Sequence, residues 1–299
     1  MKKFAYCALG LSIVPAFLVA CGGPSGALSL PTGAPITAQD LARETGEVQY
    51  LSTYYNGGVL LEYDYPKGVS PIGSISFDGG GECTSGARTF WTTSTNEIAE
   101  FKAGGSSPIR TLKANASECA IDPATGDLAA TSFNGAAIVI FHKARGKGKV
   151  IAPPVEPYFD GYDDQSDLFV DGFSSGRRAV AFIELKKGSG TFENITTSNT
   201  LGFPGSVQWD GKYVSVFDQL ANAFYRYSVR GTEATLKGTV SLSGSADCGQ
   251  TWIARPYVYC ADAGNDDVEV FKYPAGGGKI ATFTDSGGWP LGIVSLRVR

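Results

Sequence analysis

The sequence contains few histidines, methionines and charged residues. Its 299 residues include one histidine and one methionine, and 18% are charged against 43% that are hydrophobic. Because enough apolar residues to form a core accompany so few charges, the composition excludes an intrinsically disordered chain. The formal net charge of −4 and the lack of a lysine- or arginine-rich stripe argue against a nucleic-acid partner.

The single histidine also restricts the chemistry. His142 is the only histidine and no Cys-x-x-Cys spacing occurs, which argues against a zinc site. No Gly-x-Ser-x-Gly sequence with an accompanying histidine is present, which argues against a serine hydrolase. We therefore expect His142 to lie at the surface.

Glycine is abundant, and a repeat runs through the chain. The 39 glycines and 15 prolines favour a turn-rich, helix-poor fold. An aromatic residue or leucine flanked by apolar alternation recurs at intervals of 38, 40, 44, 42 and 44 residues. These six markers are Tyr63, Phe101, Phe141, Leu185, Tyr227 and Phe271.

Each repeat has the same local pattern, in which a β-rich run, a turn and a strand that ends at the marker are followed by a Gly/Pro/Lys turn. β-Branched and aromatic residues dominate most of the runs before the first turn. These runs are 47–52, 88–93, 127–132, 167–171, 212–217 and 256–261. Four short strands in about 40 residues are typical of a β-propeller blade. We expect an all-β, six-bladed propeller over residues 47–299, with a β-sandwich as the alternative.

The two ends of the repeat region predict how the ring closes. The first unit starts near Glu47 without a preceding inner strand, while 288–299 follow the last unit as surplus sequence. Pro290-Leu-Gly-Ile-Val resembles the opening of a blade. The C-terminal strand should therefore join the first blade and leave only short, protected edges.

The N-terminus has the pattern of an export signal. Lys2 and Lys3 precede an apolar run from Phe4 to Ala20. Leu18-Val-Ala-Cys21 resembles the lipobox of bacterial lipoproteins, which implies a signal peptide over 1–20 and lipidation of Cys21. The alternative is an ordinary signal peptide that ends near a cysteine. Residues 21–46, rich in Gly, Pro and Ser, are expected to form a flexible tether.

This resemblance implies an exported protein that is held at the bacterial cell envelope by a lipid in the membrane. Gly22, rather than aspartate, follows the cysteine, which by resemblance to Gram-negative lipoproteins permits sorting to the outer membrane. In such a host the protein would lie at the outer membrane or the periplasmic face.

Four cysteines remain for disulfides once Cys7 in the signal peptide and Cys21 are set aside, as an oxidising compartment favours. Cys83 and Cys119 occupy corresponding places in consecutive repeats, whereas Cys248 and Cys260 fall on successive strands of one repeat. We predict the pairs Cys83–Cys119 and Cys248–Cys260. Buried free thiols are the alternative.

Two segments carry a family resemblance. Residues 120–134 and 259–271 have the apolar-Asp, Gly-Asp or Gly-Asn, Ala-Asp and Asn landmarks of the NHL-type repeat. Over about 47–299 the chain resembles the six-bladed NHL and gluconolactonase-like superfamily. That superfamily contains binding modules, lactonases and lyases, so the resemblance implies the fold and leaves the chemistry open.

The resemblance implies two kinds of catalytic centre. Gluconolactonase-like propellers hold a divalent cation in the central channel through Glu, Asn and Asp, where it acts as a Lewis acid on a lactone carbonyl. Virginiamycin-lyase-like propellers depend on a histidine, and His142 follows a marker rather than lying near the expected channel. No residue here matches a ligand position, so we expect no cofactor, with a divalent cation such as calcium as the alternative.

Acidic residues near the expected strand ends are the candidates for such a cation. They are Asp122, Asp163, Asp164, Asp210, Asp218, Asp247 and Asp262. We expect Asp122, Asp210 and Asp262 to accept backbone N–H bonds in turns instead. Residues 160–167 are the densest acidic stretch, but they lack the EF-hand spacing and are expected to form a solvated loop.

Two functions follow. The favoured one is a monomeric, non-catalytic binding or scaffolding propeller that presents a face to a protein or small-molecule ligand. The alternative is a metal-dependent hydrolase of gluconolactonase type, which needs three or more carboxylate or amide groups at one mouth of the channel. A carbohydrate- or peptide-binding patch of Tyr54, Tyr55, Tyr158 and Tyr162 would support binding, but packing between blades explains these tyrosines equally well.

Overall fold

The computed structural model describes residues 46–298 except 54–57, 87, 134–136, 177–178 and 284–287. The predicted signal peptide 1–20, the lipidation site Cys21 and the tether up to residue 45 lie outside the described residues. In the described part, strands dominate, and a short 3-10 helix, η2 (His142–Ala144), follows one of them. None of the helices described there is long and apolar enough to cross a membrane.

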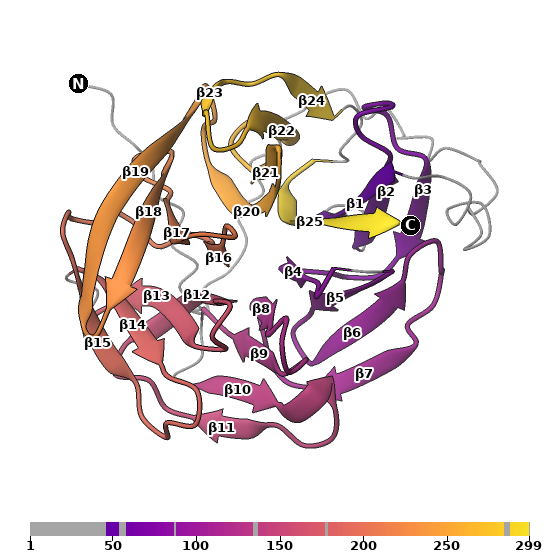
Figure 1. The fold of residues 1–299 in the computed structure, drawn as a ribbon. Helices are drawn as coiled ribbons and strands as arrows, with labels where there is room; N and C mark the ends of the chain where they lie inside the picture. Colours follow the sequence, from indigo (N-terminus) through magenta and orange to yellow (C-terminus); the bar gives the residue numbers. More distant parts are fainter. Residues whose placement is uncertain are drawn as a thin grey trace, which may run out of the picture. The chain divides into compact units, whose positions relative to one another are not determined.

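The strands form antiparallel sheets that follow one another around a ring (Figure 1). Within the described residues, four sheets have four strands each, and a fifth has nine. The nine-stranded sheet contains two antiparallel runs of four, β12–β15 and β16–β19, whose outermost strands β15 and β19 pair in parallel.

The strands of each run lie in chain order from the centre of the ring outward, apart from β25, which precedes β1. The first three runs are β25 (Pro290–Val298), β1 (Gly46–Thr53), β2 (Val59–Tyr63) and β3 (Gly73–Ser76); β4 (Glu82–Cys83), β5 (Thr89–Thr93), β6 (Glu97–Lys102) and β7 (Arg110–Lys113); and β8 (Glu118–Ile121), β9 (Leu128–Thr131), β10 (Ile138–Phe141) and β11 (Lys149–Ile151).

The remaining runs complete the ring. They are β12 (Glu156–Tyr162), β13 (Leu168–Phe173), β14 (Val180–Leu185) and β15 (Glu193–Thr197); β16 (Val207–Trp209), β17 (Val214–Asp218), β18 (Ala223–Arg230) and β19 (Glu233–Ser243); and β20 (Cys248–Ala254), β21 (Tyr257–Asp262), β22 (Asp267–Lys272) and β24 (Ala281–Phe283). The short strand β23 (Gly277–Gly278) pairs with the end of β19.

The repeat markers lie at equivalent places in this architecture. All six are buried, and each sits in the third strand from the centre. There they pack with apolar residues of neighbouring strands and sheets, as Phe101 does with Tyr50 and Phe90 and as Tyr227 does with Phe182. The marker spacing therefore predicts the third strand of each run correctly.

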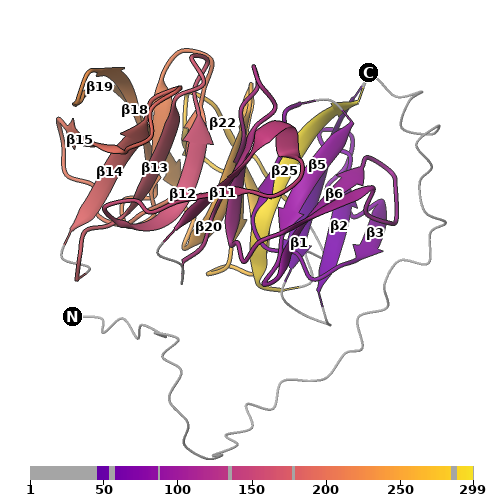
Figure 2. The same ribbon diagram turned by 90° about the horizontal axis from the view of Figure 1, so that it is seen from below.

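The C-terminal strand closes the ring as predicted. β25 pairs antiparallel with β1, from Gly46 opposite Val298 to Thr53 opposite Pro290 (Figure 2). Successive side chains of β25 pack into two separate hydrophobic clusters. Val294 packs with Phe90 of the second run, whereas Ile293 packs with Val268 of the last run.

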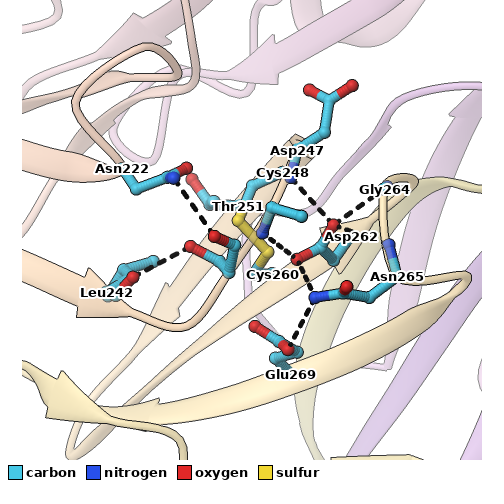
Figure 3. Close-up of a disulfide and its surroundings, with 12 residues drawn as sticks. Asn222, Leu242, Asp247, Cys248, Thr251, Cys260, Asp262, Gly264, Asn265 and Glu269 are labelled. Carbon is cyan, nitrogen blue, oxygen red and sulfur yellow. Dashed lines mark hydrogen bonds between the residues drawn. A yellow bond between two sulfur atoms is a disulfide. The ribbon is translucent and has the colours of Figure 1, made fainter. Parts of the chain in front are cut away.

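Two disulfides join strands. Cys83 on β4 is bonded to Cys119 on β8, which links the innermost strands of two neighbouring sheets. Cys248 on β20 is bonded to Cys260 on β21 within one sheet (Figure 3). These are the pairs that the repeat register predicts.

Removing either disulfide should lower the free energy of unfolding, and the loss should be larger for the disulfide that encloses the longer loop. The cysteines are separated by 36 residues in the first pair and by 12 in the second. From loop-closure entropy we expect a loss of roughly 4 kcal/mol for Cys83→Ala/Cys119→Ala and roughly 3 kcal/mol for Cys248→Ala/Cys260→Ala. Guanidinium unfolding curves measure both losses. Wild-type protein that unfolds at the same denaturant concentration with and without reductant would contradict the prediction.

Candidate functional site

A set of polar residues converges at the centre of the ring. Five of them lie on or beside the innermost strands of five different runs: Glu82 on β4, Glu118 on β8, Asp160 on β12, Ser206 before β16 and Gln250 on β20. All five are buried. The sixth innermost strand, β25, contributes Gly292, where an added Cβ atom would meet the carbonyl oxygen of Gly80. The strands therefore approach one another closely at this level.

Gln250 joins the inner strands across the centre. Its amide nitrogen donates to the backbone oxygen of Glu82 (2.8 Å) and to Oε2 of Glu118 (2.8 Å). Its amide oxygen accepts the backbone N–H groups of Glu82 (3.0 Å) and Ile293 (2.8 Å). One side chain of β20 thus bonds to β25, β4 and β8, and its donor and acceptor atoms are all engaged.

The three carboxylates around Gln250 are enclosed in protein. Glu82, Glu118 and Asp160 are 0%, 4% and 6% exposed. Both carboxylate oxygens of Glu82 and both of Asp160 lack a hydrogen-bond partner of standard geometry. Buried acceptors without partners are costly, and they are a common feature of functional sites.

Burial dominates the electrostatics of these acids. It raises the pKa of Glu82 well above its usual range, Glu118 raises it further, and the backbone N–H of Val294 offsets part of the rise. The pKa of Glu118 is likewise raised by burial and by the negative charges of Asp160 and Asp171. Burial raises the pKa of Asp160 to about 7.

Asp171, a fourth buried acid nearby, has a structural role. Its two carboxylate oxygens accept the backbone N–H groups of Phe159 (3.1 Å) and Gly205 (2.7 Å). These bonds connect β13 to β12 and to the segment that leads into β16. Asp171 is therefore satisfied by the fold, whereas Asp160 is not.

A cavity of about 240 Å³ lies beside Gln250. We call it the channel pocket. Glu118, Asp160, Ser206, Gln250 and Thr251 supply polar groups to its lining, and the hydroxyl of Thr251 has no hydrogen-bond partner. Its aromatic lining residues are Phe159, Tyr162, Trp209 and Trp252. No lysine, arginine or histidine is found among the described residues that line it.

The aspartates proposed as turn acceptors behave as predicted. Asp122 accepts the backbone N–H of Ala124 (2.9 Å), and Asp210 accepts those of Lys212 and Tyr213 (both 3.0 Å). Asp262 accepts backbone N–H groups from Ala246, Asp247, Gly264 and Asn265 (Figure 3). Asp218 does the same for Gly202 and Leu220. Asp164 and Asp247 are exposed, and none of these six lines the channel pocket.

The prediction of a solvated loop over 160–167 is wrong for two of its acids. Asp160 belongs to β12, which continues to Tyr162, and it faces the channel pocket. Asp163 is buried and accepts the backbone N–H groups of Gln165 (2.8 Å) and Asp167 (3.0 Å). Acidic density suggested a solvated loop, but the inner strand extends further than its polar composition indicates.

Of His142 and the candidate tyrosines in the described residues, only Tyr162 reaches the channel pocket. His142 is exposed, and its Nδ1 atom lies 2.9 Å from Oδ1 of Asp127. Tyr158 stacks on Phe133 with ring centroids 4.8 Å apart, as the packing alternative predicts. Tyr162 lines the channel pocket. Tyr54 and Tyr55 lie outside the described residues.

The sequence analysis missed Glu82, Glu118, Gln250 and Asp160 as site residues. A signal was present, because Gly-Glu-Cys at 81–83 and Ser-Glu-Cys at 117–119 repeat the same local pattern. By itself this repeat predicts the cysteine pair and does not single out the glutamates. The residue before each cysteine is the one that points to the centre of the ring.

The arrangement does not match a three-carboxylate metal centre at the channel. Within the described residues, two groups of three potential ligands have their atoms within 4.8 Å of one another, and both involve Asp262. One group includes the disulfide-bonded Cys248 and Cys260, and the other adds Asp267 and Glu269. Asp262 already accepts its backbone donors, and Glu269 is paired with Lys279 at 2.6 Å.

Comparisons with known proteins identify the architecture. No family model matches the sequence, and no curated protein matches it significantly. A chain in the crystal structure of a nidogen/laminin complex superposes with a TM-score of 0.66 at 12% identity, covering 85% of this chain and 99% of that one. The fold is a β-propeller.

Bacterial propellers of known structure are also similar. A protein of unknown function from Bacteroides caccae gives a TM-score of 0.63 at 12% identity, covering 84% of this chain and 99% of the other. A putative 6-phosphogluconolactonase from Bacteroides uniformis gives 0.55 at 11% identity, with 80% and 83% covered. At such identities the likeness establishes the fold of this propeller and leaves its function to the site.

The buried Asp160 should make the propeller less stable as pH rises. An aspartate with a raised pKa in the folded state stabilises the fold below about pH 4, and this contribution is lost as pH rises through about 7. Since one pKa unit corresponds to about 1.4 kcal/mol, Asp160→Asn should raise the free energy of unfolding by up to about 4 kcal/mol at pH 8 and change it little at pH 4.

Urea unfolding of the two proteins at both pH values measures this difference. Asp164→Asn is the matched control, because it removes an exposed acid from the same stretch and should change stability by less than about 0.5 kcal/mol. An Asp160→Asn effect of equal size at pH 4 and pH 8 would contradict the assignment.

Proposed function

We propose that this protein is a six-bladed, extracytoplasmic binding propeller whose ligand enters the channel pocket. The observation that carries the proposal is Asp160, a buried carboxylate that faces the channel pocket with two unpartnered oxygens. The fold satisfies the neighbouring Asp171 and Gln250 completely, whereas the two carboxylate oxygens of Asp160 and the hydroxyl of Thr251, in the same pocket lining, have no hydrogen-bond partner.

Several features support the other parts of the proposal. Counting the nine-stranded sheet as two blades gives six blades of four strands, in line with the six markers. Two disulfides indicate an extracytoplasmic protein. The similar chain from the nidogen/laminin complex comes from a protein–protein assembly, which supports binding as a use of this fold. Membership of the NHL and gluconolactonase-like superfamily rests on the repeat landmarks.

The membrane is the second partner that we propose, through a lipid on Cys21 and a tether over 21–46. The support is the apolar run that ends in Leu18-Val-Ala-Cys21. Cys21→Ser should move most of the protein from the membrane fraction to the soluble fraction in a bacterial host, and it should remove the acyl mass from the N-terminal peptide. Cys7→Ser, inside the predicted signal peptide, is the control and should leave both measurements unchanged.

Metal-dependent hydrolysis of a lactone is the alternative function. The clustering of Glu118, Asp160 and Gln250 at one pocket favours it, since three such groups are what the lactonase hypothesis requires. However, Gln250 has no free donor or acceptor atom and Glu118 already accepts its amide at 2.8 Å. Asp160 alone of the three has both oxygens unpartnered, so the donor set fits a bound metal poorly.

Metal analysis separates the two functions. We expect protein purified without chelator to contain less than about 0.1 equivalent of divalent metal by mass spectrometry, and we expect calcium and zinc to leave its melting temperature unchanged, because the amide oxygen of Gln250 and Oε2 of Glu118 already accept hydrogen bonds. Stoichiometric metal that is lost in Asp160→Asn and retained in Asp164→Asn would overturn the binding proposal and favour the hydrolase.

A further inference from the structure

We propose that the ligand of the channel pocket is a small organic cation with an aliphatic ammonium group. This inference deepens the proposed function and rests on it. It follows from three properties of the channel pocket, namely its charge, its unpartnered acceptors and its aromatic walls.

The carboxyl groups that line the channel pocket are not balanced by any basic side chain among the described lining residues. Glu118 and Asp160 are the ionisable acids in its lining, and the described lining residues include no basic side chain. Two further acids lie nearby, since Glu82 interacts electrostatically with Glu118, and Asp171 with both Glu118 and Asp160. An ionised carboxylate buried without a partner is strongly unfavourable. A cationic ligand would supply the counter-charge that the protein lacks here.

The free acceptors suit an ammonium group. Both oxygens of Asp160 and the hydroxyl of Thr251 lack hydrogen-bond partners and belong to the lining of the channel pocket. An alkylammonium group has three N–H donors, a number equal to that of these unpartnered acceptors. A calcium ion needs about six to eight oxygen ligands. The neighbouring amide of Gln250 is fully engaged and cannot contribute to such a shell.

The aromatic residues of the channel pocket provide further attraction for an ammonium group. Tyr162, Trp209 and Trp252 are half-buried and line the same cavity as Asp160. The faces of tryptophan and tyrosine attract ammonium groups, by about 0.5–2 kcal/mol depending on how far the contact is desolvated. The cavity volume of about 240 Å³ restricts the ligand to a small molecule. A neutral polyol would contact the same rings but would leave the carboxylate charge unbalanced.

Calorimetric titration of the full mature chain at pH 8 and low salt tests the proposal. The probes are 1,4-diaminobutane, its neutral counterpart 1,4-butanediol, and calcium chloride. We expect the diamine to bind with 1:1 stoichiometry and at least tenfold more tightly than the diol. Asp160→Asn should weaken diamine binding at least tenfold, and Asp164→Asn should leave it unchanged.

A second variant keeps the test valid if Asp160→Asn fails to fold. Glu118→Gln removes the other lining carboxyl group and should weaken diamine binding while leaving the far-ultraviolet circular dichroism spectrum unchanged. If the diamine and the diol bind equally tightly and Asp160→Asn weakens both, the ammonium assignment is overturned. The proposed function of the channel pocket in ligand binding would then still hold. If calcium alone binds, both the ammonium assignment and the proposed function are overturned. The same conclusion follows if none of the three probes binds.

Discussion

Ring closure by β25 is the constraint on which the rest of this propeller depends. The pairing of β25 with β1 joins the last part of the chain to the first described strand and gives β1 an inner neighbour. It also places Ile293 and Gly292 at the centre. The backbone N–H of Ile293 meets the amide oxygen of Gln250, and the missing side chain of Gly292 leaves room for Gly80. Without this pairing, β1 would have no inner neighbour, and Gln250 would lose its bond to Ile293.

At the centre of the propeller, some buried polar side chains have all their hydrogen-bond partners and others have none of standard geometry. Gln250 and Asp171 use all the bonds available to them and tie inner strands together. The carboxylate oxygens of Glu82 and Asp160, buried beside them, have no hydrogen-bond partner of standard geometry, and the described lining of the channel pocket contains no basic side chain to balance Asp160. Proteins usually tolerate such a local cost where function requires it, because packing elsewhere supplies the stability. The hydrophobic clusters between sheets and the two disulfides serve that purpose here.

Much of the architecture could be read from local sequence. The six markers predict the third strands, since a buried position recurs whenever the same four-strand unit is repeated. Asp122, Asp210 and Asp262 were recognisable as turn acceptors because their donors lie two or three residues away along the chain. The exception was Asp160. Its place in an acidic stretch suggested solvent, while the extent of β12 placed it inside the ring.

The sequence by itself determined the all-β repeat, the surplus C-terminal strand and the cysteine pairs, because each follows from periodicity, from corresponding places in consecutive units or from successive strands of one unit. Only the tertiary structure decided the site. Gln250 bonds to Glu118 over 132 positions in the chain and to Glu82 over 168. Equivalent residues of different blades meet because a ring directs them all to one axis, and which of them remains without a partner depends on distances that no local pattern contains.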